Sequence, residues 1–219
     1  MPGAYTHARQ GLRTRLAEVV SRRARAARRQ LFERLMQPGP DDPIVDVGCG
    51  QAGLAAFAPD LAITGVDREP RPGYAAGRHR FLQGDATALP FADAEFEIAY
   101  SNSVVEHIVD PGARQQFADE VRRVARRYFV QTPDRWFPVE PHSLLPLVHW
   151  LPRRLGRRLW RLGVSGDPFD ETLLLGPREL RALFPDARIV RERLGPLTKS
   201  LVAVGPAPGR PGVRGGPGA

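Results

Sequence analysis

The 219-residue sequence is poor in cysteine and lysine and has no long hydrophobic run. Its one cysteine, Cys49, excludes an internal disulfide and a zinc site built from several cysteines. No run of about 18 or more apolar residues is present, so we expect no membrane-spanning helix. The N-terminus is studded with arginine and lacks the apolar centre of a secretory signal. These absences favour a cytoplasmic protein, and no metal site is predicted.

Arginine supplies nearly all of the basic charge, because the only lysine is Lys199. The formal net charge is +8, and the chain also contains 22 glycines and 22 prolines, a composition that indicates a GC-rich coding bias. A basic balance favours anionic partners such as nucleic acids, phosphorylated substrates or acidic lipid surfaces. The charge alone does not choose among these partners.

Residues 9–36 have the apolar spacing of an amphipathic helix, which Pro38-Gly39-Pro40 ends. We assign residues 1–40 to an arginine-rich helical cap. Two interpretations of its charge remain open: a solvated helix face, or a basic lid over an anionic ligand. Its nine arginines are Arg9, Arg13, Arg15, Arg22, Arg23, Arg25, Arg28, Arg29 and Arg34.

Strand and helix patterns alternate along the middle of the chain. We expect strands at 43–47, 62–66, 80–83, 96–100 and 127–131, and helices near 51–58, 103–108, 112–126 and 177–184. This alternation predicts an α/β fold with a Rossmann-like, doubly wound, mostly parallel sheet of seven strands. The last two strands form an antiparallel hairpin around Gly195-Pro196.

The domain boundaries are placed where the alternation of strand and helix patterns stops. Residues 41–205 form the main domain, and residues 133–175, rich in Pro, Trp and Arg, are a helical insertion after the fifth strand. Residues 206–219 cannot bury apolar surface, so we expect a disordered tail.

The loop "GCGQAG" after the first strand predicts a ligand site. Gly48, Gly50 and Gly53 match the G-x-G-x-x-G pattern, and such glycines let the backbone approach a ligand closely. Asp67 ends the second strand, where a carboxylate can accept both hydroxyls of a ribose. These features fit NAD and S-adenosylmethionine equally well.

Further polar residues distinguish between NAD and S-adenosylmethionine as the expected cofactor. Asp46 would repel a pyrophosphate but attract an α-amino group. Asp85 follows the third strand, where it can accept a hydrogen bond from an adenine amino group. The fourth strand ends in Ser101-Asn102-Ser103, small polar groups suited to the amino-acid end of a cofactor. The set favours S-adenosyl-L-methionine.

The ordered motifs resemble class I S-adenosylmethionine-dependent methyltransferases, of the small-molecule type that includes quinone-biosynthesis C-methyltransferases. The resemblance covers about residues 40–132. It rests on D-V-G-C-G at 46–50, G-V-D at 65–67, G-D-A at 84–86, L-P-F-x-D-x-x-F-E at 89–97 and S-N-S-V-V-E-H at 101–107.

The resemblance implies a cofactor site residue by residue. The methionine end would lie on the glycine loop, the ribose on the second strand's acid, and the adenine beside the third strand. The residues implied for the methionine end are Asp46, Gly48, Gly50, Gln51 and Asn102. Asp67 is implied for the ribose, and Arg68, Asp85 and Ala86 are implied for the adenine. Cys49 is expected to be a small filler beneath the cofactor.

A general base is needed only if the acceptor loses a proton, as a hydroxyl does. The candidates are Glu106, His107, Glu140 and His142, and His142 is the first choice because it lies in the insertion where this family binds substrate. For His107 the alternative is a buried histidine bonded to the backbone.

The composition of the insertion also indicates what kind of molecule accepts the methyl group. It combines Trp136, Phe137, Trp150 and Trp160 with arginines at 153, 154, 157, 158 and 161. Residues 144–162 could contact an anionic membrane, which favours a lipid-linked acceptor over an ordinary small molecule, or could simply form a cap helix.

Three alternative functions stay open. An NAD(P)-binding oxidoreductase leaves Asp46 and Asp85 unexplained. An RNA methyltransferase is less favoured, because no (Asp/Asn)-Pro-Pro-aromatic motif follows the fourth strand and Cys49 belongs to the loop. A non-catalytic interaction protein on the same scaffold would not need the acidic positions. We therefore expect O- or C-methylation of a small or lipid-linked molecule.

Overall fold

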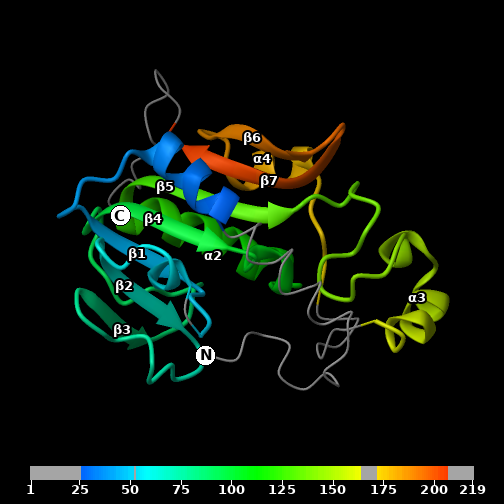
Figure 1. Cartoon of the computed structure of the whole chain (residues 1–219), viewed down its shortest axis with the longest axis horizontal. Coiled ribbons are helices and arrows are strands. Elements are labelled where there is room, and N and C mark those ends of the chain that lie inside the picture. Colours follow the sequence, from blue (N-terminus) through cyan, green and yellow to red (C-terminus); the bar gives the residue numbers. More distant parts are fainter. Residues whose placement is uncertain (1–25, 52, 164–171, 207–219) are drawn as a thin grey trace.

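The structure is a computed structural model that describes residues 26–51, 53–163 and 172–206 (Figure 1). Most of the predicted cap helix, and the predicted tail beyond Pro206, lie outside these ranges. Within them, no helix is long and apolar enough to cross a membrane.

Seven strands form one sheet in the order β3-β2-β1-β4-β5-β7-β6. The first five are parallel, and β7 runs antiparallel to both of its neighbours. The predicted fold class, including the antiparallel C-terminal hairpin, is confirmed. The strands are β1 Pro43–Val47, β2 Ala62–Asp67, β3 His79–Gln83, β4 Phe96–Asn102, β5 Ala125–Pro133, β6 Arg188–Leu194 and β7 Leu197–Gly205.

The central strands are apolar on both faces, as expected for parallel strands covered by other elements on each side. In β1, Ile44 pairs with Ile63 of β2 and Ile98 of β4, and all three are buried. This row of β-branched side chains suits a pleated, buried surface. It sets the register that brings the carboxyl ends of β1, β2 and β4 together.

One face of the sheet is covered by α2 (Pro111–Val124) and α4 (Pro177–Leu183). Helix α2 begins at Asp110, whose side chain accepts a hydrogen bond of 2.7 Å from the Ala113 N–H, and Pro111 occupies its first turn. Phe117 and Val121 of α2 and Leu180 of α4 are fully buried in a common core with the strands. Burial of this apolar stripe holds α2 on the sheet.

The opposite face is covered by the helical residues 26–36. Phe32 points into the sheet and makes edge-to-face contacts with Tyr100 and Phe129, at centroid distances of 5.2 and 5.6 Å. Leu54 of the short 3₁₀ helix η1 (Leu54–Ala56) joins the same core. Because helices cover both faces, the sheet is doubly wound.

Two predicted helices are shorter than expected. Only η1 forms within 51–58, and only the 3₁₀ helix η2 (Val105–His107) forms within 103–108. Pro59 follows the first segment directly and disfavours helical geometry at Ala58, the residue before it. Both connections stay close to the strand ends, which leaves the edge above β1 and β4 accessible.

The insertion holds the 3₁₀ helix η3 (Val148–Trp150) and α3 (Arg153–Trp160). Figure 1 shows α3 at the end of the molecule toward which the parallel strands point. In open α/β sheets ligands bind beyond these carboxyl ends, so the insertion is on the side of the expected site.

Candidate active site

A pocket of about 260 Å³ lies at the carboxyl ends of β1, β2 and β4. Its wall combines backbone from two glycines with acidic, hydroxyl and imidazole side chains. The lining residues are Gly48, Val66, Asp67, Arg68, Gly84, Asp85, Ala86, Thr87, Ser103, Val104, His107 and Ile108. Six of the predicted site residues are therefore brought together here: Gly48, Asp67, Arg68, Asp85, Ala86 and His107.

The glycine loop passes tightly between β2 and the segment after β4. Gly48 has φ +73°, and a Cβ atom there would lie 2.3 Å from a methyl carbon of Val104. Its N–H donates to the Val66 carbonyl over 2.8 Å. The positive φ and the lack of room for a Cβ atom both require glycine at this position. Its backbone, without a side chain, forms part of the pocket wall.

Asp46 lies beneath this loop and does not line the pocket. Its carboxylate is 1% exposed and accepts hydrogen bonds from the Leu54 N–H (2.7 Å) and the Tyr74 hydroxyl (2.9 Å). Burial raises the pKa of Asp46 to about 6, and the negative charge of Asp67 raises it slightly further. The two hydrogen bonds lower this pKa but do not outweigh burial. Asp46 thus holds the loop in shape from below.

Cys49 is buried in the same region, and burial raises the pKa of its thiol. A neutral, shielded thiol is a poor nucleophile. Its position fits the expected role as a filler beneath the loop.

Asp67 ties the end of β2 to the glycine loop. One carboxylate oxygen accepts the Gly50 N–H over 2.8 Å, and the other accepts from the Glu69 N–H and from Arg71, each over 3.0 Å. A carboxylate has further lone pairs, so a ribose hydroxyl could still be accepted from the pocket side.

Arg68 and Asp85 face each other across the pocket rim. Their side chains form an ion pair of 2.8 Å, and Asp85 also accepts from the N–H and hydroxyl of Thr87. Partial desolvation opposes ionisation of Asp85, but the bonds from Thr87 and Arg68 outweigh it and lower the pKa of this carboxyl. A charged acceptor therefore lies where adenine recognition was predicted.

Gln51 and Asn102 do not line the pocket. Gln51 is exposed at the tip of the glycine loop, and the Asn102 side-chain oxygen is buried without a partner among the described residues. Ser103 takes the expected place of Asn102 on the pocket wall, with a backbone φ of +57° and its hydroxyl bonded to Gln131 over 3.2 Å.

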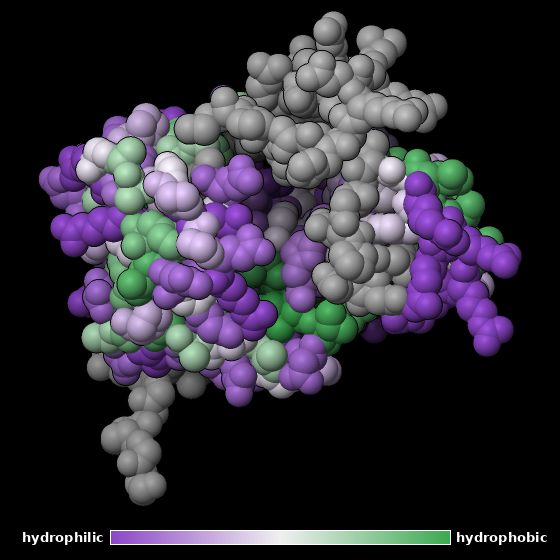
Figure 2. Space-filling view, turned by 90° about the horizontal axis from the view of Figure 1, so that it is seen from below, coloured by the Kyte–Doolittle hydropathy of each residue, from purple (hydrophilic) through white to green (hydrophobic). Residues whose placement is uncertain are grey.

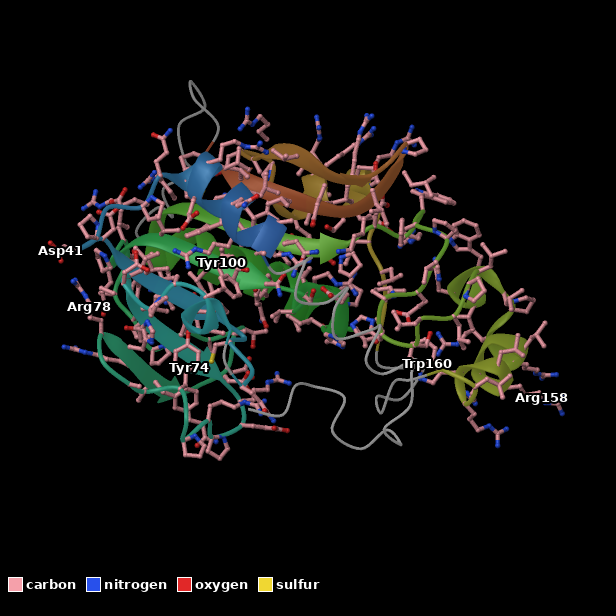
Figure 3. All side chains as sticks on the ribbon, in the orientation of Figure 1. Asp41, Tyr74, Arg78, Tyr100, Arg158 and Trp160 are labelled. Carbon is pink, nitrogen blue, oxygen red and sulfur yellow. The ribbon has the colours of Figure 1, made fainter. Side chains whose placement is uncertain are left out.

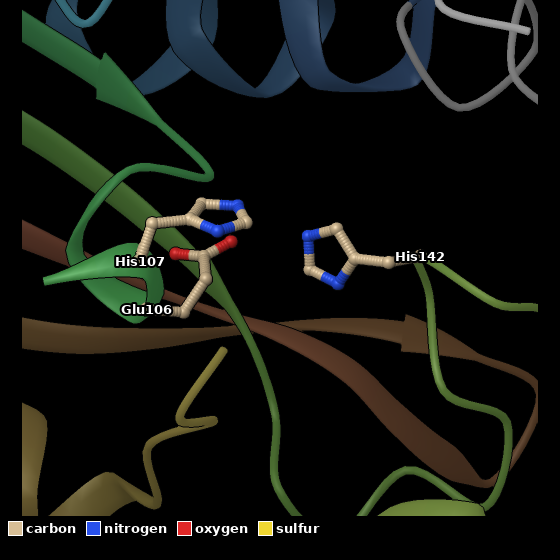
Figure 4. Close-up of side chains that lie close together, drawn as sticks. All are labelled: Glu106, His107 and His142. Carbon is tan, nitrogen blue, oxygen red and sulfur yellow. The ribbon is translucent and has the colours of Figure 1, made fainter. Parts of the chain in front are cut away.

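Glu106, His107 and His142 converge beside the pocket (Figure 4). One potential ligand atom from each lies within 4.8 Å of those of the other two. The rings of His107 and His142 meet edge to face at a centroid distance of 4.9 Å. His107 is exposed, so the alternative of a buried histidine bonded to the backbone is wrong.

Glu106 is the buried member of this cluster. It is fully buried, accepts a hydrogen bond of 2.9 Å from the Thr132 hydroxyl, and leaves its other carboxylate oxygen without a partner among the described residues. Burial raises its pKa, although His107 and His142 partly oppose this effect. An unpartnered buried carboxylate oxygen is costly, which indicates a site kept for another group.

Glu140 orients His142. Its buried carboxylate contacts His142 Nδ1 over 2.7 Å and accepts the backbone N–H of His142 and the hydroxyl of Ser143. Burial of Glu140 favours its neutral form, but the hydrogen bonds from His142 and Ser143 outweigh burial and lower its pKa. All four predicted catalytic residues therefore belong to one group.

The sequence interpretation missed the supporting residues. Arg71 and Tyr74, which hold Asp67 and Asp46, come from the irregular connection after β2, where no pattern marks them. Thr132 was detectable: it is the last residue but one of β5, and polar residues at the carboxyl ends of parallel strands are candidates for a site.

Residues 45–128 match a family model described as "Methyltransferase domain". These residues contain the glycine loop and every strand end that lines the pocket. By this match, residues 45–128 belong to a methyltransferase domain. S-adenosyl-L-methionine is the cofactor of this family.

Sequence relatives match a limited part of the chain. An uncharacterized methyltransferase of Mycobacterium leprae is 34% identical over 91 residues, which are 38% of this chain and 33% of the relative. The match thus spans about a third of the length of the curated relatives.

Solved structures extend the likeness to the whole sheet. A Methanosarcina mazei S-adenosylmethionine-dependent methyltransferase is similar with a TM-score of 0.51 at 19% identity, over 80% of this chain and 95% of its own. A Burkholderia thailandensis 1,6-didemethyltoxoflavin N1-methyltransferase, solved with S-adenosylhomocysteine, gives 0.50 at 18% identity, over 86% and 84%. At these identities the likeness establishes the fold.

The pocket's own chemistry fits the cofactor. Gly48 gives close backbone approach, and a Cβ at Gly50 would meet no atom within 4 Å, so the loop leaves open space there. Asp67 and Asp85 supply two separate acceptors along the pocket. The open glycine loop and the two carboxylate acceptors suit a ligand that contains a ribose and an adenine.

Proposed function

We propose that this methyltransferase transfers a methyl group from S-adenosyl-L-methionine to an oxygen or carbon of a small or lipid-linked acceptor. One observation carries the proposal: His107 lies in the wall of the cofactor pocket and also belongs to the cluster with Glu106 and His142. Groups suited to binding a cofactor and groups suited to accepting a proton therefore meet at one place.

Each part of the pocket has an assigned task in this proposal. Gly48 and Gly50 hold the methionine end, Asp67 holds the ribose, and Arg68, Asp85 and Ala86 flank the adenine. When bound, the cofactor supplies an activated methyl group on a sulfonium. The protein aligns the acceptor and excludes water, and such positioning can lower a barrier by up to about 7–11 kcal/mol.

The dyad of Glu140 and His142 supplies the base for a hydroxyl acceptor. Glu140 bonded to Nδ1 over 2.7 Å fixes the orientation of the imidazole and stabilises its protonated form. The geometry supports the sequence-based choice of His142 as the principal base or acceptor contact.

The insertion supports a lipid-linked acceptor. Leu147, Trp150 and Leu155 are each 45% exposed, and Leu162 is 72% exposed, next to arginines of α3. Figure 2 shows hydrophilic side chains projecting from this end of the molecule with hydrophobic ones beside them. An exposed apolar surface with arginines at its border suits the interface of an anionic membrane.

The proposal is tested by calorimetric titration with S-adenosylhomocysteine, with NAD run in parallel. We expect micromolar binding of S-adenosylhomocysteine and none of NAD. Asp67→Ala should weaken binding at least tenfold, because Asp67 both orders the Gly50 loop and faces the ribose position. Asp93→Ala, an exposed acid outside the pocket, is the control and should leave the affinity unchanged. Equal affinities of the two variants would refute the site assignment.

A further inference from the structure

The cluster of Glu106, His107 and His142 has the composition of a metal site. Two imidazoles and a carboxylate, with three protein ligands in all, are a donor set that binds zinc in catalytic sites and leaves a coordination position open. The sequence predicted no metal, because the residues come from two distant segments, the 3₁₀ helix η2 and the insertion. Only the fold places their ligand atoms within 4.8 Å of one another.

The buried carboxylate of Glu106 indicates that the cluster binds a cation. Glu106 is 0% exposed, one of its oxygens has no partner among the described residues, and no arginine or lysine pairs with it there. An ionised carboxylate in such a place needs a positive charge to offset its desolvation. Figure 4 shows the ring of His142 facing Glu106 and His107 from the opposite side.

Glu140 acts as the outer partner that metal-binding histidines usually have. Its contact with His142 Nδ1 over 2.7 Å favours the tautomer with the proton on Nδ1 and the lone pair on Nε2, the form that coordinates a metal. Glu106 and Glu140 together also carry the two negative charges that balance a divalent ion.

The geometry needs only a small adjustment. Ligand atoms at about 2.0–2.1 Å from a tetrahedral zinc are about 3.3–3.5 Å apart, somewhat closer than the 4.8 Å limit here. His107 is exposed, so its side chain can rotate toward the other two ligands without displacing the buried Glu106.

We propose that Glu106, His107 and His142 bind a divalent transition-metal ion of the zinc type, and that the ion receives the hydroxyl oxygen of the acceptor. The second part rests on the proposed methyltransferase function. A bound cation lowers the pKa of an oxygen ligand toward neutrality. With the ion bound, His142 serves as a ligand in place of its role as the base. The acceptor then loses its O–H proton to bulk water and keeps the electron pair on oxygen, so no further co-reactant is needed. The acceptor class is thus a hydroxyl compound, and the reaction is O-methylation.

The first experiment titrates the chelator-stripped full chain with Zn²⁺ alone by calorimetry. Metal content after dialysis gives the stoichiometry, and the visible spectrum with Co²⁺ reports the ligand set. We expect one ion per chain. Glu106→Gln and His142→Ala should each weaken Zn²⁺ binding at least tenfold, and Glu140→Gln about 10- to 100-fold as an outer partner.

His149→Ala is the matched control, because His149 is another histidine of the insertion and bonds the Arg135 carbonyl outside the cluster. It should bind Zn²⁺ like the unaltered chain. Equal Zn²⁺ affinity in the cluster variants and in His149→Ala would overturn the metal site, as would no binding by the unaltered chain.

Titration of every variant with S-adenosylhomocysteine separates the two proposals and tests that the variants fold. Retained S-adenosylhomocysteine binding with lost Zn²⁺ binding supports the metal site. Zn²⁺ binding by a chain that does not bind S-adenosylhomocysteine would leave the metal site standing but overturn its role in methyl transfer.

Discussion

Asp46 is a carboxylate buried beneath the cofactor loop, and no cation pairs with it among the described residues. Its Oδ2 accepts hydrogen bonds from the Leu54 N–H and the Tyr74 hydroxyl, which fasten the loop to the connection after β2. Gly53 is packed against it so closely that a Cβ there would lie 2.0 Å from the carboxylate. At the scale of single residues, the loop is shaped by an acid that was expected to contact the cofactor.

Asp46 should make stability fall as the pH rises. Its pKa is raised by burial from 3.8 to about 6, so the folded chain binds this proton more tightly than the unfolded chain does. Its favourable contribution is complete below about pH 4 and is lost as the pH rises to about 6. Relative to Asp46→Asn, the free energy of unfolding should decrease by up to about 3 kcal/mol across this range.

Urea unfolding at intervals between pH 4 and 7 measures this difference. Asp93→Asn, an exposed acid, serves as the control and should show no comparable trend against the unaltered chain. A difference for Asp46→Asn that stayed flat or grew with pH would contradict the assignment.

Helix α3 is the element whose surface differs most from the rest of the fold. It has eight residues, with Gly156 and Trp160 buried and Leu155 exposed. Figure 3 shows Arg158 projecting away from the body of the molecule. Its burial pattern supports packing of one side onto the insertion, while the arginines on the other side suit an anionic surface.

Arg154→Glu with Arg158→Glu should reduce binding to vesicles that contain anionic lipid at least tenfold, because each residue near the surface contributes about 1 kcal/mol. Flotation with anionic and with zwitterionic vesicles measures the effect. The control is Arg178→Glu with Arg181→Glu in α4, which should bind vesicles like the unaltered chain. If both pairs behaved alike, α3 would be a cap helix only.

The whole molecule depends on two cores, one on each face of the sheet. The core beneath α2 is built from the sheet, α2 and α4, whereas the opposite core also needs residues 26–36 from the start of the described chain. Phe32 is 1% exposed and contacts two aromatic residues of the central strands. The N-terminal helix is thus a structural part of the domain in the segment described, whatever its arginines bind.

Phe32→Ala should lower the free energy of unfolding by about 3–5 kcal/mol, because it leaves a cavity between the helix and the sheet. Chemical denaturation monitored by far-UV circular dichroism measures this change. Arg34→Ala, at an exposed position of the same helix, should change stability by less than about 0.5 kcal/mol. A small effect of Phe32→Ala would mean that the helix is not needed to close this face.

Local patterns were enough to predict the strands, their parallel or antiparallel pairing, and the glycine loop and acids at the ends of β1, β2 and β3, because hydrophobic periodicity and turn chemistry are local. These patterns overestimated two helices, which are single 3₁₀ turns in the structure. Only the tertiary structure decided that Asp46 lies under the loop and that Ser103 lines the pocket in place of Asn102. It also decided that His142 meets Glu106 and His107. Such contacts depend on how distant loops return to one edge of the sheet, and no local pattern encodes that path.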